Sequence, residues 1–406
     1  MEKLKRVVSE IAYSHDFSKL SQLHRSLLPL LTLASCFYNF SVTTRHHLYS
    51  LGKQRLPVPV ISVGNLTWGG NGKTPMVEFL CHWFCNSGIS PLILSRGYAG
   101  GDEVKMLERH LMGTSAKVGI GANRATAANQ FLERYGHIDS CTNNFFENLL
   151  LVNKVGTDVT SDKIGVAILD DGMQHVSLER DLDIVMVNGL TPWGNNQLIP
   201  LGPLREPLSS LARADIIVIH HADLVPEKNL ISLKLGIQEI KKSLPVFFSR
   251  MVPSHFFTVH NVGTELPLSA VKSRVLLCLS AIGSPKGFVK CIEKLGPSHV
   301  DQLHYSDHYL FQSKDICMMM RRLEELHHNF GCRPIVVTTE KDYDRDCEIL
   351  SKLHPFDILV LCSHLQFVPH NGSSEKGFKE LLKQLLDSRP RRHKLTPSTE
   401  DTTSST

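Results

Sequence analysis

A glycine-rich segment that ends in lysine and threonine is the feature of this sequence that most directly indicates chemistry. Residues 64–74 read Gly-Asn-Leu-Thr-Trp-Gly-Gly-Asn-Gly-Lys-Thr and follow an apolar run at residues 58–63. Glycines in such a turn let backbone N–H groups surround phosphate oxygens, while the lysine reaches the outer oxygens and the threonine hydroxyl binds Mg²⁺. The expected phosphate-binding residues are Gly69, Gly70, Asn71, Gly72, Lys73 and Thr74.

One position departs from the usual phosphate-loop pattern. That pattern has a glycine five residues before Gly72, where this sequence has Thr67. The remaining Gly-Gly-x-Gly-Lys-Thr core follows a β-branched strand and precedes Pro75 and a helical stretch over residues 76–85, which is the context the motif requires. The alternative is a glycine turn with a solvated lysine, and the context disfavours it.

Two adjacent carboxylates provide a magnesium partner for this loop. Asp170 and Asp171 follow the hydrophobic residues 164–169. A strand that ends in acidic residues is the usual second half of a nucleotide–magnesium site, so one carboxylate is expected to coordinate Mg²⁺ or its water. A solvated acidic turn is the alternative interpretation.

Other polar residues could assist phosphoryl transfer. Asp102 and Glu103 come shortly after an expected strand at residues 91–94, and His308 lies in a loop between an aspartate and a tyrosine. A carboxylate or a histidine is the usual base for an acceptor hydroxyl, but spacing alone does not show that these residues meet. Arg205, in a loop rich in proline and glycine, could neutralise phosphoryl charge or form an ordinary salt bridge.

The expected secondary structure places these residues along one edge of a sheet. Near-continuous Val, Ile and Leu runs indicate strands that are buried on both faces, hence a parallel sheet covered by helices. Ligands bind such sheets at the carboxyl ends of the strands. The expected strands cover residues 58–63, 91–94, 164–169, 182–187 and 215–219.

A second unit follows a break near residues 241–245. Segments at residues 246–248 and 256–259 read as short bridging strands, and strands at 275–279, 334–337 and 357–361 alternate with helices at 286–295 and 314–329. We therefore predict an α/β protein with a P-loop NTPase-like parallel sheet domain, helices on both its faces, and a smaller α/β domain. The predicted boundaries are 1–56 for an N-terminal segment, 57–245, a linker at 246–262, 263–387, and a disordered tail at 388–406.

Composition excludes several classes of protein. The chain has 406 residues, 44 basic and 40 acidic side chains and a net charge of +4, which is too balanced for a protein whose main partner is nucleic acid. Its 10 cysteines include no CxxC pair, so a disulfide framework or a zinc ribbon is not expected, and a reducing compartment fits best.

The most apolar stretch lies near the N-terminus, at residues 27–40. It is shorter than the roughly 20 residues needed to cross a bilayer. Arg25 precedes it and Arg45 follows it, which suits a helix in the headgroup region of a membrane, although an ordinary core helix is equally compatible. The acidic residues among the first twenty make that segment a poor match to a transit peptide.

The order of these motifs resembles one family, the tetraacyldisaccharide 4'-kinases of lipid A biosynthesis. A threonine in place of the first glycine of the phosphate loop is part of the likeness. The 7 matching motifs are residues 60–75, SRGY at 95–98, GDE at 101–103, LDDGMQH at 169–175, GPLREP at 202–207, DH at 307–308 and TEKD at 339–342.

The resemblance implies a kinase that uses ATP and Mg²⁺ to phosphorylate the 4'-hydroxyl of a tetraacylated glucosamine disaccharide 1-phosphate. It implies that Asp102 is the acceptor base, assisted by His308, and that a cleft between the two domains closes over ATP. The implied catalytic residues are Asp102, His308, Lys73 and Arg205, and the implied metal ligands are Thr74, Asp170, Asp171 and Glu206.

The resemblance also bears on location. It implies that residues 27–40 are a peripheral membrane anchor that brings the enzyme to its acylated substrate. Residues 133–162 look like an insertion relative to compact bacterial members, and with the tail they suggest a mitochondrial protein of a eukaryotic host. In a bacterium the expected site would be the cytoplasmic face of the inner membrane.

Two alternatives stay open. A P-loop switch or metal-insertion GTPase would share the phosphate loop but would read guanine through Asn-Lys-x-Asp, and the nearest string, residues 153–156, ends in glycine. The other alternative is a catalytically inactive lipid-binding scaffold that keeps the fold.

Overall fold

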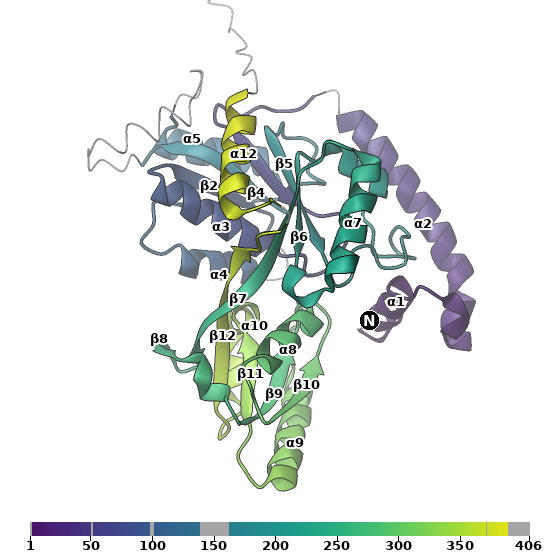
Figure 1. Ribbon diagram of the computed structural model, residues 1–406, viewed down its shortest axis with the longest axis vertical. Coiled ribbons are helices and arrows are strands. Elements are labelled where there is room, and N and C mark those ends of the chain that lie inside the picture. The colour runs from purple at the N-terminus through teal and green to yellow at the C-terminus, as the bar shows by residue number, and fades with distance from the viewer. Residues whose placement is uncertain (1, 50–51, 98–100, 139–161, 371, 389–406) are drawn as a thin grey trace, which may run out of the picture.

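A computed structural model describes residues 2–49, 52–97, 101–138, 162–370 and 372–388 of the chain, and two lobes joined by long strands make up the molecule (Figure 1). One 12-stranded sheet runs through both lobes in the order β10-β9-β11-β12-β7-β6-β5-β1-β4-β2-β3, with β8 paired to β7. We call the part from β6 to β3 the first lobe and the part from β12 to β10 the second lobe. Tyr98, most of the insertion and the tail from residue 389 lie outside the described residues.

The first lobe is built on parallel strands, as its sequence predicts. Strands β1, β2, β4 and β6 are buried along their whole length because helices cover both faces of the sheet. The predicted α/β class, with a parallel sheet covered by helices on both faces, is therefore confirmed. The strands are β1 (Val60–Gly64), β2 (Ser90–Ser95), β3 (Lys117–Ile120), β4 (Ile164–Asp170), β5 (Leu182–Asn188) and β6 (Ile216–His220).

Helices cover both faces of this sheet. Helix α3 packs on the face that carries Ile61 and Ile93, while α5 packs on the opposite face against Val60 and Leu92. The helices described in the first lobe include α3 (Lys73–Asn86), α4 (Asp102–His110), α5 (Arg124–Tyr135) and α7 (Glu227–Ile240). Short 3-10 helices lie at Leu208–Arg213 and Ala222–Leu224, at Phe17–Lys19 in the N-terminal segment and at Leu268–Val271 in the second lobe.

The long strand β7 (Val246–Thr258) carries the chain from the first lobe to the second. Its first residues pair in parallel with β6, and its remainder pairs antiparallel with β12 (Ile358–Phe367). The two short segments expected at residues 246–248 and 256–259 are thus the ends of one strand. Strand β8 (Asn261–Leu266) folds back on it as a hairpin.

The second lobe is a smaller α/β unit with its own core. Its strands β9 (Val275–Ser280), β10 (His299–His304) and β11 (Ile335–Thr339) are parallel, and β11 also pairs in parallel with β12. Helix α8 covers one face of these strands through Phe288, and α9 covers the other through Leu323. The helices of this lobe are α8 (Pro285–Glu293), α9 (Ser313–Phe330), α10 (Glu340–Arg345) and α11 (Cys347–Ser351).

The last helix, α12 (Glu375–Ser388), does not pack with the second lobe, although its sequence position suggested that it would. Its buried residues Phe378, Leu382 and Leu386 join the core beneath α3. Strand β12 carries the chain back across the lobe boundary, so the first lobe contains both earlier and later sequence. The division at residues 245 and 263 itself stays a prediction.

The N-terminal segment forms two helices, α1 (Glu2–Ala12) and α2 (Gln22–Tyr49). Helix α2 has 28 residues, twice the length of the apolar stretch at residues 27–40, and it lies along the side of the first lobe (Figure 1). Hydrogen bonds attach it there, from the Ser35 hydroxyl to the Leu198 carbonyl (3.0 Å) and from the Tyr38 hydroxyl to the Arg205 carbonyl (3.0 Å).

Candidate active site

The phosphate loop follows β1 and is held in shape by its own side chains. The Asn71 amide donates to the Gly69 carbonyl at 2.9 Å, and the Asn65 amide donates to the Thr67 carbonyl at 2.6 Å. Helix α3 then begins at Lys73, so that its first backbone N–H groups and the positive end of its dipole face the loop. The loop can therefore bind an anion without rearranging.

Thr67 occupies the place of the missing first glycine and has a structural role there. It forms an antiparallel bridge to Leu204, and the Arg205 N–H donates to the Leu66 carbonyl at 2.6 Å. These contacts attach the phosphate loop to the proline-rich loop. They explain how Arg205, which is distant in sequence, reaches the site.

Glycine is required at position 72 for two reasons. Its φ angle of +82° lies in the left-handed region, and a Cβ atom there would come within 2.7 Å of the His220 ring. Burial holds the pKa of His220 well below its usual value, so this ring is neutral, and Nδ1 lies 2.9 Å from the Ser249 hydroxyl. The sequence favours a surface or hydrogen-bonded histidine at position 220 and does not predict its place beside the phosphate loop, although its position directly after a predicted strand was a signal.

The two acidic residues after β4 have different environments. Asp170 is buried, and burial raises the pKa of its carboxyl above the usual range. Burial would do the same to Asp171, but Lys73 at 3.5 Å and Arg205 at 2.7 Å hold the pKa of Asp171 below its usual range. Arg205 thus forms an ion pair with Asp171, and it also lines the cavity between the lobes that is described below.

Thr74 and Asp170 fit a magnesium ion that is bound together with nucleotide phosphates. The Thr74 hydroxyl lies 3.5 Å from Asp170 Oδ2, and Asp170 Oδ1 is buried without a hydrogen-bond partner among the residues that the structure describes. Mg²⁺ takes hard oxygen ligands, and usually only one or two come from protein side chains, the rest being phosphates and waters. Consistently, no group of three or more His, Cys, Asp or Glu in the described ranges could hold a metal.

Of the two remaining implied metal ligands, Asp171 contacts Lys73 and Arg205. Glu206 lies away from Thr74 and Asp170. Its two carboxylate oxygens accept hydrogen bonds from Gln174 (3.2 Å) and Arg213 (2.6 Å). It is buried and is not among the described residues that line the cavity. Its contacts instead support the loop that carries Arg205.

Asp102 and His308 meet across the boundary between the lobes. Asp102 is the first residue of α4, and its Oδ2 lies 3.1 Å from Nδ1 of His308. The same oxygen accepts hydrogen bonds from Arg345 at 2.7 and 3.0 Å, while Oδ1 accepts the Glu103 N–H at 2.9 Å. Burial would raise the pKa of Asp102, but hydrogen bonds from His308 and Arg345 and the charge of Lys341 lower it to about 2.

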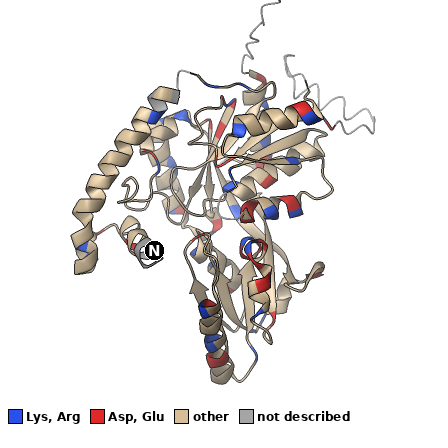
Figure 2. Ribbon diagram, turned by 180° about the vertical axis from the view of Figure 1, so that it is seen from behind, with Lys and Arg blue, Asp and Glu red and all other residues tan. Residues whose placement is uncertain are grey.

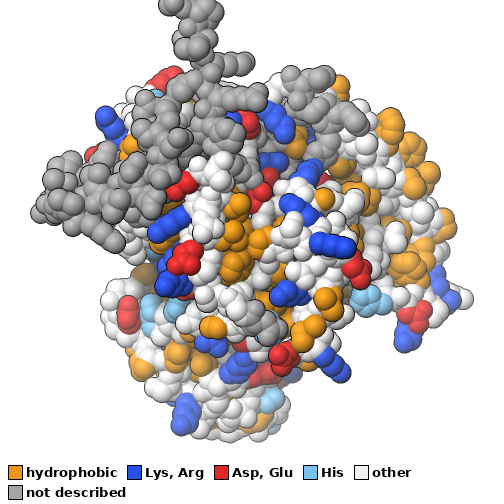
Figure 3. Space-filling view, turned by 45° about the horizontal axis from the view of Figure 1, so that its top comes forward, with side chains coloured by type: hydrophobic (Ala, Val, Ile, Leu, Met, Phe, Trp, Pro, Cys, Tyr) orange, Lys and Arg blue, Asp and Glu red, His pale blue; other side chains and the backbone are white. Residues whose placement is uncertain are grey.

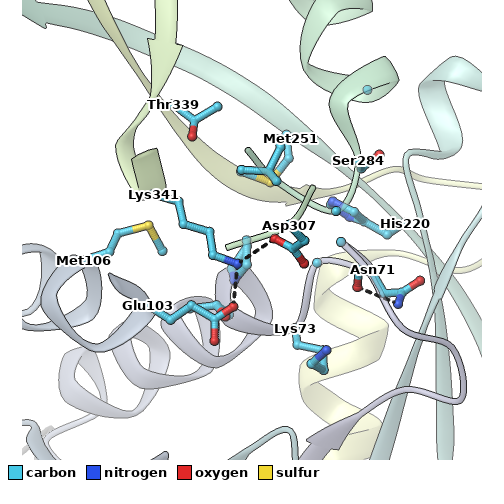
Figure 4. Close-up of a pocket in the computed structure, with 18 of the residues that line it drawn as sticks. Asn71, Lys73, Glu103, Met106, His220, Met251, Ser284, Asp307, Thr339 and Lys341 are labelled. Carbon is cyan, nitrogen blue, oxygen red and sulfur yellow. Dashed lines mark hydrogen bonds and ion pairs between the residues drawn. The ribbon is translucent and has the colours of Figure 1, made fainter. Parts of the chain in front are cut away.

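Lys341 is a second cation from α10 at this boundary. Its ammonium lies 2.8 Å from Glu103 and 3.5 Å from Asp307, and Figure 4 shows it pointing between these two carboxylates. It is also 3.4 Å from Nε2 of His308. The TEKD motif at residues 339–342 carried the resemblance, yet no role was assigned to it; its place directly after a predicted strand was the available signal.

A cavity of about 540 Å³ lies between the lobes and collects most of the expected site residues. Such a volume suits a nucleotide or a drug-sized ligand. Asp102 lies just behind the wall, reached through His308. The cavity is lined by the loop residues from Gly69 to Thr74 and by Glu103, Asp170, Asp171, Arg205, His308 and Lys341, together with apolar side chains such as Met106, Met251 and Phe288.

The second lobe covers the phosphate loop closely. A Cβ atom on Gly283, in the loop after β9, would come within 1.9 Å of the Gly70 nitrogen. Backbone therefore packs on backbone at this contact, and no larger residue is accommodated there. The two lobes are in a closed arrangement.

An ionic cluster joins α3, α4 and α10 beside the cavity. His110 lies 2.6 Å from Glu340 and 2.9 Å from Glu78, and Arg109 contacts Glu340 at 3.0 Å and Asp344 at 2.8 Å. Burial works to lower the pKa of His110, but the hydrogen bonds to Glu340 and Glu78 outweigh it and raise the pKa to about 10.

This cluster predicts a pH-dependent stability. Because the pKa of His110 rises from 6.5 to about 10 on folding, its stabilising contribution is complete below pH 6.5 and disappears as the pH rises through 10. We expect the free energy of unfolding to fall over this range in the wild type, and to fall less in His110→Gln, as measured by urea denaturation at several pH values. Parallel curves for the two proteins would contradict the assignment.

The fold and this site define a nucleotide-dependent phosphotransferase of the P-loop class. The particular family follows from comparison with known proteins. A family model described as tetraacyldisaccharide-1-P 4'-kinase matches residues 27–387, and the chain belongs to this family. The alternative of a GTPase is therefore not favoured.

Individual relatives agree with this assignment. A protein of Arabidopsis thaliana named "Probable tetraacyldisaccharide 4'-kinase, mitochondrial" is 53% identical over 389 residues, which are 95% of this chain and 98% of that protein. The tetraacyldisaccharide 4'-kinase of Syntrophus aciditrophicus is 30% identical over 88% of this chain and 92% of its own length.

A solved structure supports the fold. The crystal structure described as the "apo" form of LpxK from Aquifex aeolicus in complex with ATP superposes with a TM-score of 0.55 and 23% identity, over 90% of this chain and 100% of that chain. Membership of the family makes the chain a kinase that uses ATP and Mg²⁺ in lipid A biosynthesis.

Proposed function

We propose that this enzyme transfers the γ-phosphoryl group of ATP to the 4'-hydroxyl of a tetraacylated glucosamine disaccharide 1-phosphate, with His308 and Asp102 managing the acceptor proton. The observation that carries the proposal is one cavity that Lys73, Asp170 and His308 line together. Lys73 and Asp170 belong to the first lobe, and His308 to the second. The disaccharide is proposed to enter between them.

The residues of the first lobe position the nucleotide. Lys73 and the backbone N–H groups at the start of α3 would hold the phosphates, and Arg205 would approach the transferred group. Thr74 and Asp170 would hold Mg²⁺, which would neutralise charge on the phosphate oxygens. Most of the catalytic effect of such a site comes from positioning and electrostatics.

Proton removal from the acceptor is assigned to His308, with Asp102 behind it. The side chain of Asp102 is 1% exposed, and both of its oxygens accept hydrogen bonds, whereas that of His308 is 26% exposed and lines the cavity. We therefore place the proton on Nε2 of His308 during transfer, and Asp102 stabilises the resulting imidazolium through Nδ1. This differs from the expectation that Asp102 itself meets the hydroxyl.

The function is tested by incubating the full chain with Mg-ATP and the detergent-dispersed tetraacylated disaccharide 1-phosphate. We expect the lipid to gain one phosphate, located on the 4'-oxygen by NMR, and to gain none without Mg²⁺. His308→Gln serves as the matched inactive control. If the wild type binds ATP but leaves the lipid unchanged, the inactive-scaffold alternative is correct.

Membrane contact through α2 is part of the proposal. Side chains on its outer face are exposed and apolar, including Leu30 (64%), Phe37 (67%) and Phe40 (73%), and Figure 3 shows hydrophobic side chains gathered along this side of the molecule. The helix contains no acidic residue, and Figure 2 shows basic residues only near its ends. This arrangement suits a helix in the membrane interface.

Helix α2 is also long and apolar enough to cross a membrane over Gln22–Arg45, by length and composition alone. Contacts with the first lobe favour the interfacial position, because Ser35, Tyr38 and Arg45 each donate a hydrogen bond to a backbone carbonyl of that lobe. Attachment to the folded lobe at these points supports a helix that lies along the membrane surface.

Replacing Phe37 and Phe40 together by glutamate is expected to weaken binding to anionic vesicles by at least about 100-fold, since burial of each ring is worth about 1.5–3 kcal/mol. Vesicle co-sedimentation measures the effect, and Leu310→Glu, at an exposed leucine of the second lobe (57%), is the control. Equal binding of both variants would refute the α2 assignment.

On the strength of the Arabidopsis relative we place the enzyme on a mitochondrial membrane, which cell fractionation checks.

A further inference from the structure

Arg345 is a buried arginine that reaches from one lobe into the catalytic group of the other. It is the last residue of α10, and its side chain is 2% exposed. Its Nε and Nη2 atoms lie 3.0 and 2.7 Å from Oδ2 of Asp102, and Nη1 lies 2.7 Å from Asp342. A guanidinium buried between two carboxylates holds a fixed orientation.

The same carboxylate oxygen determines the state of His308. While Asp102 is ionised, its Oδ2 atom can accept hydrogen bonds but cannot donate one. Nδ1 of His308, which lies 3.1 Å from this oxygen, must therefore carry the proton of the hydrogen bond. The neutral ring then has its lone pair on Nε2. The Lys341 ammonium, which can only donate, lies 3.4 Å from Nε2 and is consistent with this tautomer.

We propose that Arg345 is a positioning residue for phosphoryl transfer, which keeps Asp102 ionised and fixed so that His308 presents an unprotonated Nε2 to the acceptor hydroxyl. The inference rests on the function proposed above. It assigns a role to α10, whose TEKD motif has none in the proposed reaction.

The physical reason lies in the burial of Asp102. A carboxylate taken out of water without a cation tends to become protonated. A protonated Asp102 could donate to Nδ1, which would move the ring proton of His308 to Nε2 and remove the base from the cavity. Arg345 prevents this by stabilising the charged form of Asp102.

The arrangement also couples catalysis to closure of the lobes. Asp102 belongs to α4 of the first lobe, whereas His308 and Arg345 belong to the second. Neither lobe therefore contains a complete proton-accepting group by itself. Docking of α10 on α4 brings the three side chains together.

Other charges face these groups and enter the pH dependence. Asp102 is faced by His308, Arg345 and Lys341, and His308 is also faced by Asp307 at 3.9 Å. Glu103 and Asp307 together offset the charge of Lys341. Loss of Arg345 therefore leaves Asp102 with less opposing charge and within reach of protonation at mildly acid pH.

The test compares Arg345→Met and Arg345→Lys with wild type in the full chain, using kcat, the KM values for both substrates, and the pH profile of kcat. We expect Arg345→Met to lower kcat by about 100-fold, at the lower end of what loss of a general base costs. In Arg345→Met the KM values should change by less than about threefold, and the acid limb of the kcat profile should move to higher pH. Arg345→Lys should have a kcat about tenfold higher than that of Arg345→Met, because lysine keeps the charge.

Arg322→Met is the matched control, because Arg322 pairs with Asp301 in the second lobe outside the cavity. It should leave kcat and the pH profile unchanged. Wild-type kcat and an unshifted acid limb in a folded Arg345→Met would overturn the proposal. If Arg345→Met fails to fold, Arg345→Lys gives the test, because lysine retains the buried charge but lacks the two-pronged guanidinium. Wild-type kcat and an unshifted acid limb in Arg345→Lys would then overturn the proposal.

A further measurement separates this inference from the function on which it rests. If wild type phosphorylates no lipid, the proposed function fails, but ¹⁵N NMR of the histidine rings still reports the tautomer, with the His308 signals assigned through His308→Gln. We expect the Nδ1–H form in wild type and its loss in Arg345→Met. An identical tautomer in both proteins would refute the role of Arg345.

Discussion

Replacement of Asp102 by asparagine is expected to lower kcat by about 10²–10⁴-fold, which corresponds to about 3–5 kcal/mol of transition-state stabilisation. The asparagine keeps the shape of the side chain but carries no charge, so it cannot stabilise the imidazolium of His308 at 3.1 Å. ATP binding should persist, because Asp102 is not among the described residues that line the cavity. Initial rates and calorimetric titration with Mg-ATP measure the two quantities.

Stability must be followed in the same experiment. Asparagine at position 102 leaves Arg345 buried with one carboxylate fewer, and removal of one partner of a buried pair costs about 3–5 kcal/mol. Rates are therefore compared at a temperature where urea denaturation shows both proteins folded. Asp301→Asn, which disrupts the Asp301–Arg322 pair away from the cavity, should retain activity. A rate within tenfold of wild type for Asp102→Asn would remove Asp102 from the mechanism.

Replacement of Lys73 by methionine is expected to lower kcat by about 10²–10³-fold, the usual effect of removing one charge-stabilising donor from a site. Lys73 lies at the start of α3 with its ammonium 3.5 Å from Asp171, on the wall of the cavity. We propose that it is the cation that the phosphate loop directs at the transferred group. Methionine preserves the length and the apolar stem of the side chain, so the loop should keep its shape.

Two measurements check the Lys73 prediction. Single-turnover rates report the transfer step, and the Kd for Mg-ATP, expected to rise, reports ground-state binding. Lys272→Met, at an exposed lysine of the second lobe, is the control. Loss of ATP affinity with an unchanged single-turnover rate would mean that Lys73 serves binding alone.

The two predictions concern residues from both sides of one cavity. Lys73 belongs to the first lobe and is proposed to act on the phosphates, while Asp102, also of the first lobe, is proposed to act through His308 of the second lobe. A kinase of this design is complete only when closed, and the contact of Gly283 with Gly70 shows how close the closed lobes are. Substitution of Gly283 by any larger residue would hold the lobes apart.

Contiguous sequence was enough to identify the phosphate loop and most of the first lobe. Residues 69–74 determine the backbone conformation of the phosphate loop locally, through their glycines and the start of the helix. Their pattern can therefore be recognised without knowledge of the fold. Strands buried on both faces read as apolar runs for the same local reason. The sequence did not predict strands β3 and β10, because their residues are partly exposed and include polar side chains.

Only the tertiary structure decided how the remaining side chains are paired. Arg345 and Asp102 are 243 residues apart, and their 2.7 Å contact depends on the packing of α10 against α4, which no local pattern encodes. The same is true of Glu206, which the family resemblance implied as a metal ligand but whose carboxylate accepts hydrogen bonds from Gln174 and Arg213. Local sequence determines backbone geometry, whereas the charge state and orientation of a buried side chain depend on partners that only folding brings near.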